Sequence, residues 1–97
     1  MDIITKMGGK LLFEGKHGSE YLINGHYIYT IPAKSLNIVV SPDDKTLITD
    51  EMSYSIYHST ALRNFPKRKN KGEREIHYGY KIIFDNEKAF EEFISKF

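Results

Sequence analysis

Short apolar segments separated by turn residues run through the first third of the chain. Apolar side chains dominate three of these segments, 10–14, 20–23 and 26–31. Asn24-Gly25 lies between the last two, and this dipeptide favours a type I′ turn because both residues tolerate positive φ angles. Pro32 ends the third segment, since it has no amide proton to donate to a neighbouring strand. The pattern predicts a three-stranded antiparallel meander.

A second hairpin is predicted directly afterwards. Residues 36–40 (LNIVV) and 45–49 (KTLIT) are apolar and β-branched, and Ser41-Pro42-Asp43-Asp44 lies between them. Proline presets the φ angle of a turn, and aspartate side chains can bond to their own backbone. We therefore expect 45–49 to form a strand that pairs with 36–40.

Residues 50–62 alternate with a period of two, which is the spacing of a half-buried strand. The alternating positions are Met52, Tyr54, Ile56, His58, Thr60 and Leu62. A helix that begins at Asp50 is the alternative, because aspartate is a favoured N-cap residue. The strand is preferred, and residues 74–84 are expected to pair back onto it antiparallel. In this later segment Ile76, Ile82, Ile83 and Phe84 are predicted to belong to the sheet and the core.

The last dozen residues have the pattern of an amphipathic helix. Asp85-Asn86 supplies N-cap chemistry. One face is apolar at helical spacing, and it consists of Ala89, Phe90, Phe93, Ile94 and Phe97. The sequence thus predicts a single α+β domain over 1–97, with an antiparallel sheet of about six strands and this C-terminal helix packed on it.

Composition excludes several classes of site. The chain has 97 residues and no cysteine, so it has no disulfide, no thiolate nucleophile and no cysteine-based zinc site. The four histidines lack the spacing of metal ligands, and we expect no metal and no cofactor. No run approaches the roughly 18 apolar residues of a membrane span. We expect a soluble cytoplasmic protein without membrane contact.

The net charge of +1 conceals a strong asymmetry. Residues 63–74 carry six basic residues and one acidic residue, whereas the rest of the chain carries eight basic and twelve acidic residues. The segment is predicted to be a hairpin loop, and long loops in small domains are commonly functional or disordered. Its basic residues, Arg63, Lys67, Arg68, Lys69, Lys71 and Arg74, are the predicted contact set.

Three interpretations of this basic loop remain open. It could dock on a protein partner, because complementary charge accelerates association. It could bind nucleic acid, with tyrosines of the adjoining strands as stacking platforms for bases. These tyrosines are Tyr54, Tyr57, Tyr78 and Tyr80, of which the last three complete the predicted binding site. The loop could also be a solvated hairpin tip that only keeps the protein soluble.

A repeated histidine motif suggests an enzymatic alternative. His17-Gly18-Ser19 and His58-Ser59-Thr60 both read H-x-[ST], and residues i and i+2 of a strand share a face. Each pair would offer an imidazole and a hydroxyl to one phosphate. The arrangement resembles the paired motifs of two-histidine phosphoesterases, and the resemblance implies that the two histidines act as general base and acid. This hypothesis ranks behind a binding function without catalytic residues.

The preferred hypothesis is a non-enzymatic protein that occupies a macromolecular partner through the basic loop. In size, absence of cysteine and richness in Lys, Ile and Tyr the chain resembles small inhibitors encoded by phages and mobile elements, anti-CRISPR proteins among them. The first alternative is a nucleic-acid-binding module that uses the same loop. A homodimer through an exposed sheet edge is also expected to be possible.

Overall fold

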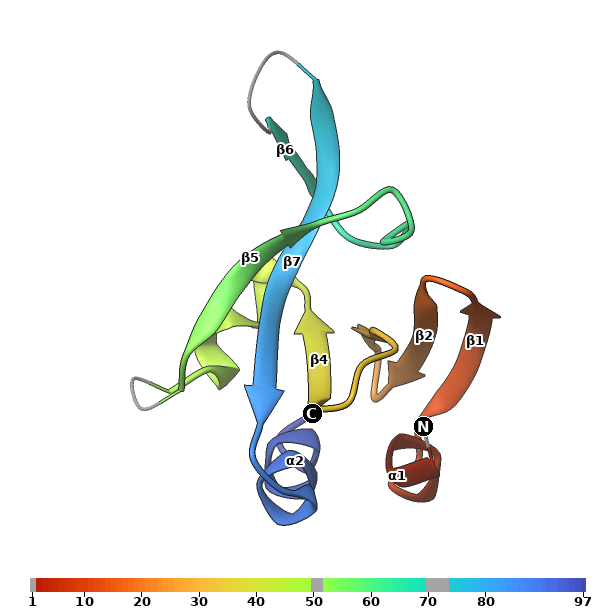
Figure 1. Cartoon of the computed structure of the whole chain (residues 1–97), viewed down its shortest axis with the longest axis vertical. Coiled ribbons are helices and arrows are strands. Elements are labelled where there is room, and N and C mark those ends of the chain that lie inside the picture. Colours follow the sequence, from red (N-terminus) through yellow and green to blue (C-terminus); the bar gives the residue numbers. More distant parts are fainter. Residues whose placement is uncertain (1, 50–51, 70–73) are drawn as a thin grey trace.

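The computed structural model describes residues 2–49, 52–69 and 74–97 (Figure 1). A seven-stranded antiparallel sheet has the order β1-β2-β3-β4-β7-β5, and β6 pairs with β7 beside this path. The strands are β1 Lys10–Gly15, β2 Gly18–Ile23, β3 His26–Thr30, β4 Leu36–Val40, β5 Tyr54–His58, β6 Lys67–Lys69 and β7 Glu75–Phe84. The helices are α1 Asp2–Lys6, the 3₁₀ helix η1 Pro42–Leu47, and α2 Glu87–Ile94. The predicted α+β class, an antiparallel sheet with a C-terminal helix, is confirmed.

The N-terminal meander follows from its turn residues. Asn24 and Gly25 have φ angles of 49° and 82°, and Ile23 pairs with His26 across them. Both central residues therefore adopt the positive φ angles that a type I′ turn requires. The predicted Asn-Gly hairpin between β2 and β3 is confirmed.

One face of the sheet packs against α1 and α2. Alternate residues of β2, β3, β4 and β7 point toward these helices, and Phe84 lies edge-on to Phe90 with ring centroids 5.3 Å apart. The side chain of Asn86 caps α2 by accepting a hydrogen bond from the Ala89 amide at 2.8 Å. Phe90, Phe93 and Ile94 are buried, as the helical pattern predicted. Burial of this face holds the C-terminal half of β7 in place.

The opposite face carries a second, smaller core. Tyr29 follows Ile28 and Val39 follows Ile38, both of which belong to the first core, so Tyr29 and Val39 point to the opposite face of the sheet. Residues 59–66 cross this face and bury Leu62 and Phe65 against them. The Phe65 ring lies so close to Gly79 of β7 that an added Cβ atom would be 3.0 Å from it, and 2.8 Å from the Val40 carbonyl oxygen of β4. Residues 59–66 lead directly into β6, so this core fixes the base of the β6–β7 hairpin.

The predicted strand over 45–49 is wrong. Pro42–Leu47 forms η1, in which the Ser41 side chain accepts a hydrogen bond from the Asp43 amide at 3.3 Å. The His26 ring contacts the Asp44 carboxylate at 2.8 Å and ties η1 to β3. Both edges of β4 are already paired, with β3 and with β7. A strand at 45–49 would therefore have no edge of β4 to pair with.

The structure shortens one further predicted element, corrects the placement of Ile83 and adds a helix. The strand within 50–62 is confirmed for Tyr54–His58 and ends there, because the Ser59 side chain caps a turn by accepting from the Ala61 amide at 3.1 Å. Ile83 is 58% exposed, since Ile82 and Phe84 occupy the core positions on either side. The short helix α1 was not predicted, although it buries Ile4 completely.

Candidate nucleic-acid interface

Part of the basic segment, Lys67–Lys69, forms a strand where a loop was predicted, and it makes a two-stranded ribbon with the start of β7. Lys67 pairs with His77, Arg68 with Ile76 and Lys69 with Glu75. The Pro66 carbonyl accepts a hydrogen bond from the Tyr78 amide at 2.9 Å at the base of the ribbon. Figure 1 shows β6 and the first half of β7 projecting from the rest of the molecule, at the end opposite to α1 and α2. The ribbon therefore presents its cations away from the cores.

The structure brings together only part of the predicted contact set. Lys67, Arg68 and Lys69 are exposed on β6, and Arg74 is exposed just before β7. Arg63 lies elsewhere, with its guanidinium 5.0 Å from the centre of the Phe13 ring on β1. Lys71 falls outside the described residues.

A row of aromatic side chains lies on one face of β5 and β7. His58 pairs with Tyr78, Ile56 with Tyr80 and Tyr54 with Ile82, so these side chains share that face. The ring centroids are 4.9 Å apart for Tyr54 and Tyr80, 6.2 Å for Tyr78 and Tyr80, and 6.0 Å for His58 and Tyr78. Tyr54 and Ile56 are 41% and 46% exposed. We call Tyr54, Ile56, His58, Tyr78 and Tyr80 the aromatic face.

A cation lies over each end of the aromatic face. The Arg68 guanidinium is 5.3 Å from the centre of the Tyr78 ring. The Lys45 amine is 5.9 Å from the Tyr54 ring centre and 5.8 Å from that of Tyr80. Such distances permit cation–π attraction. Sequence reasoning missed Lys45, because its position depends on η1, which was predicted as a strand.

Tyr57 does not belong to the aromatic face. It pairs with Gly79 and is therefore directed to the opposite face of the sheet. There it is partly buried beside the second core, with the Lys81 amine 6.0 Å from its ring centre. The structure thus separates Tyr57 from Tyr78 and Tyr80, the two tyrosines with which it was predicted to act.

The two histidine motifs lie at opposite ends of the strand order. His17 is exposed in the turn between β1 and β2, whereas His58 ends β5. Four strands separate β1 from β5 in the sheet. The Nε2 atom of His58 is buried without a hydrogen-bond partner among the described residues. The strand pairing therefore does not place the two histidines opposite each other, as a shared phosphate site on paired strands would require.

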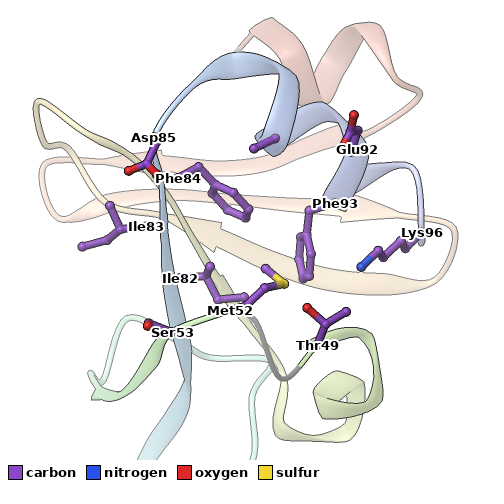
Figure 2. Close-up of a pocket in the computed structure, with 11 residues that line it drawn as sticks. Thr49, Met52, Ser53, Ile82, Ile83, Phe84, Asp85, Glu92, Phe93 and Lys96 are labelled. Atoms are coloured by element: carbon purple, nitrogen blue, oxygen red, sulfur yellow. The ribbon is translucent and has the colours of Figure 1, made fainter.

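A cavity of about 630 Å³ lies between α2, the end of β7 and the chain that precedes β5. Figure 2 shows the side chains of Met52, Ile82 and Phe93 converging on its floor, while Ile83 points away. Asp85, Glu92 and Lys96 are among the polar residues at its rim. The volume is within the range of ligand pockets. An apolar floor with a charged rim suits an apolar side chain of a partner better than a phosphate.

The second core contains buried polar groups. Glu20 is 3% exposed, and the Asn64 side chain donates to its Oε1 atom at 3.0 Å. Its Oε2 atom and the Tyr29 hydroxyl have no hydrogen-bond partner in the described part of the chain. Burial raises the pKa of the Tyr29 hydroxyl, and nearby Tyr57 and Glu20 raise it further. Tyr29 therefore stays neutral under all ordinary conditions.

The two edges of the sheet differ in how they are protected. β1 has a bulge between Leu11 and Phe13 and carries Lys10 and Glu14, all of which oppose pairing with another strand. β5 has no charged residue and no register shift against β7. The homodimer through a sheet edge stays a prediction, and β5 is the edge that we expect to take part.

Comparison with protein-family models, with curated proteins and with solved structures finds no match. Within the described ranges, no cluster of three or more His, Cys, Asp or Glu side chains is arranged to hold a metal ion. None of the helices that the structure describes is long and apolar enough to cross a membrane. The assignment of a function therefore depends on the geometry of the ribbon and the aromatic face.

Proposed function

We propose that this protein binds single-stranded nucleic acid through the aromatic face and the β6–β7 ribbon. The observation that carries the proposal is the continuity of the two surfaces. Arg68 belongs to the ribbon and lies over Tyr78 of the aromatic face. A strand lying across this surface would meet phosphate-binding cations and base-stacking rings in succession. Proteins that bind single strands without sequence preference combine these two elements.

The charges of the ribbon support the proposal. Among the described residues, no acidic side chain lies within ion-pair distance of Lys67, Arg68, Lys69 or Arg74. Clustered cations without acidic partners repel one another. A polyanion relieves this repulsion and releases its condensed counterions, which drives binding at low salt.

The tyrosines of the aromatic face supply the second element. Stacking of a base on an aromatic side chain contributes about 1–3 kcal/mol, and it tolerates any base because every base has a π-face. Tyr54 and Tyr80 lie side by side on neighbouring strands, and Tyr78 follows Tyr80 along β7. This arrangement favours single strands over a duplex, whose bases are already stacked.

Fluorescence anisotropy with a labelled single strand tests the proposal. We expect binding at low salt, and we expect Arg68→Glu to weaken it by about tenfold, since it removes a phosphate contact and a cation over Tyr78. Lys88→Glu is the matched control: it makes the same change of net charge on the exposed face of α2 and leaves the affinity nearly unchanged. Equal effects of the two substitutions would show that only net charge matters, and would refute the proposed site.

A protein partner is the second candidate, and the cavity of Figure 2 favours it. Ile83, which is 58% exposed, adds an apolar contact on the adjoining strand end. In this function the protein would occupy its partner as an inhibitor, as the composition of the chain suggested, without catalysis. A stoichiometric partner that is lost with Ile83→Glu and retained with Arg68→Glu would support it. The opposite dependence would assign the partner to the ribbon instead.

A further inference from the structure

A second cavity lies beside the ribbon formed by β6 and the start of β7. Its volume is about 360 Å³, and it is lined by Thr60, Lys67, Arg74, Glu75, Ile76 and His77. Lys67 and His77 are paired residues, so their side chains share one side of the ribbon. Arg68 and Tyr78 lie on the other side, as does Ile76, which pairs with Arg68. Neither Arg68 nor Tyr78 lines the cavity, so the cavity is distinct from the surface proposed to stack bases.

The chemistry of the lining suits an anion. Lys67 and Arg74 contribute two positive charges, and neither has an acid within ion-pair distance in the part of the chain that the structure describes. Glu75 is the acidic residue of the lining, and it lies opposite Lys69 in the strand register without an ion pair within contact distance. Arginine and lysine together favour phosphate, because the guanidinium donates two hydrogen bonds and the ammonium adds a point charge.

His77 is held in a fixed orientation at this cavity. Its Nδ1 atom is 2.6 Å from the Phe65 carbonyl oxygen. A carbonyl can only accept a hydrogen bond, so Nδ1 carries the proton and donates it. The remaining ring nitrogen, Nε2, is then an acceptor in the neutral ring, so it can accept a hydrogen bond from a sugar hydroxyl of a ligand. Thr60 adds a hydroxyl that can donate to a phosphate oxygen, and it is kept nearby because the Ser59 amide donates to the His77 carbonyl at 3.0 Å.

From this lining we infer that the cavity binds a phosphate monoester. A recess lined by two cations complements a terminal phosphate of charge near −2, whereas a diester must continue out of the recess in both directions. The cavity has the volume of a small-ligand pocket, so a sugar can enter with the phosphate. The inference rests on the proposed function only for the source of the ligand, which is either the 5′-phosphate of a bound strand or a free nucleoside monophosphate.

Amide chemical shifts of the whole chain, titrated with inorganic phosphate and then with adenosine 5′-monophosphate, test the site itself. We expect saturable shifts at Thr60, Lys67 and His77, and their loss in the Arg74→Gln variant. The Tyr78→Ala variant should keep them, because Tyr78 lies on the other side of the ribbon. Shifts spread evenly over surface lysines, or shifts unchanged by Arg74→Gln, would overturn the inference. Arg74 is exposed, so its variant is expected to fold normally, which its spectrum will verify.

A pair of oligonucleotides distinguishes the two sources and separates this inference from the proposed function. A 5′-phosphorylated ten-nucleotide strand should bind about tenfold more tightly than its 5′-hydroxyl counterpart. Arg74→Gln should abolish most of this difference. If neither strand binds but the monophosphate gives the expected shifts, the proposed function fails and the cavity binds free nucleotide. If both strands bind equally and no phosphate shifts occur, the phosphate site fails and the stacking surface stands.

Discussion

Gly79 is a position at which the fold is expected to be sensitive to one added methyl group. It lies in the middle of β7, opposite Tyr57. A Cβ atom there would be 2.7 Å from Val39 Cγ1, 2.8 Å from the Val40 carbonyl oxygen and 3.0 Å from Phe65 Cδ2. The carbonyl contact is with the backbone of β4, which is hydrogen-bonded to β7. Rotation of a side chain therefore cannot relieve it.

The expected cost of Gly79→Ala follows from these contacts. Overpacking of a filled core costs about 1–3 kcal/mol. Alanine recovers about 0.5–1 kcal/mol relative to glycine inside a strand, because the unfolded chain loses less entropy. The net loss is about 1–2 kcal/mol, which corresponds to a decrease in Tm of about 5–15 °C for a domain of this size.

Thermal unfolding followed by far-UV circular dichroism measures this loss, and tyrosine fluorescence is a second probe since the chain has no tryptophan. Gly15→Ala is the matched control, because its Cβ would meet only the exposed Phe13 ring at 3.0 Å, which can rotate away. We expect the control to change Tm by less than about 3 °C. A Gly79→Ala variant as stable as the control would refute the close packing of β4 and of the Phe65 ring on Gly79.

Further substitutions test other parts of the structure. Tyr29→Phe should stabilise the protein by about 1 kcal/mol in urea unfolding, because it removes a buried hydroxyl without a partner among the described residues. Because the pKa of Tyr29 is raised in the folded state, this tyrosine ionises first in the unfolded state, so the stability of the wild-type protein should fall as the pH rises above 10. The phenylalanine variant should lose less stability over the same pH range. A destabilised variant would reveal a hydrogen bond to the Tyr29 hydroxyl. Asn37→Ala should lower the free energy of unfolding by about 2–4 kcal/mol. The Asn37 side-chain amide bonds to the backbone N–H and C=O of Ile31, each at 2.8 Å, and the substitution would leave both groups unpaired. A loss of stability below about 0.5 kcal/mol would contradict these bonds. Phe93→Asp should abolish the cooperative unfolding transition, because Phe93 is 2% exposed in the main core and an unpaired charge cannot be accommodated there; a folded variant would show that α2 does not pack as described.

Local chemistry explains which elements were predictable. The β2–β3 hairpin depends on Asn24-Gly25, and α2 on a helical repeat with a cap at Asn86, so each is encoded within a short window. η1 was not predictable in this way. Its last residues belong to 45–49 (KTLIT), which has the apolar and β-branched composition of a strand. The outcome depends on β7, distant in sequence, taking the free edge of β4.

The same distinction applies to the candidate site. Tyr78 and Tyr80 share a face because they are two residues apart on one strand, which the sequence alone establishes. Whether Tyr57 joins them depends on the register between β5 and β7. A shift of one residue would move Tyr57 to the aromatic face, because side chains alternate between faces. The observed register pairs it with Gly79 instead, and no local pattern encodes that choice.

The salt dependence of single-strand binding tests the central claim most directly, because it separates the cations from the rings. Wild-type protein should show a log–log slope of about −2 to −4, at about −0.7 for each phosphate contacted. Tyr78→Ala should weaken binding by about 1–3 kcal/mol at every salt concentration and leave the slope unchanged. Arg68→Glu should make the slope shallower by about one. Absence of binding at low salt, or a Tyr78→Ala variant that binds as tightly as wild type, would contradict the claim that the aromatic face and the ribbon form one nucleic-acid interface.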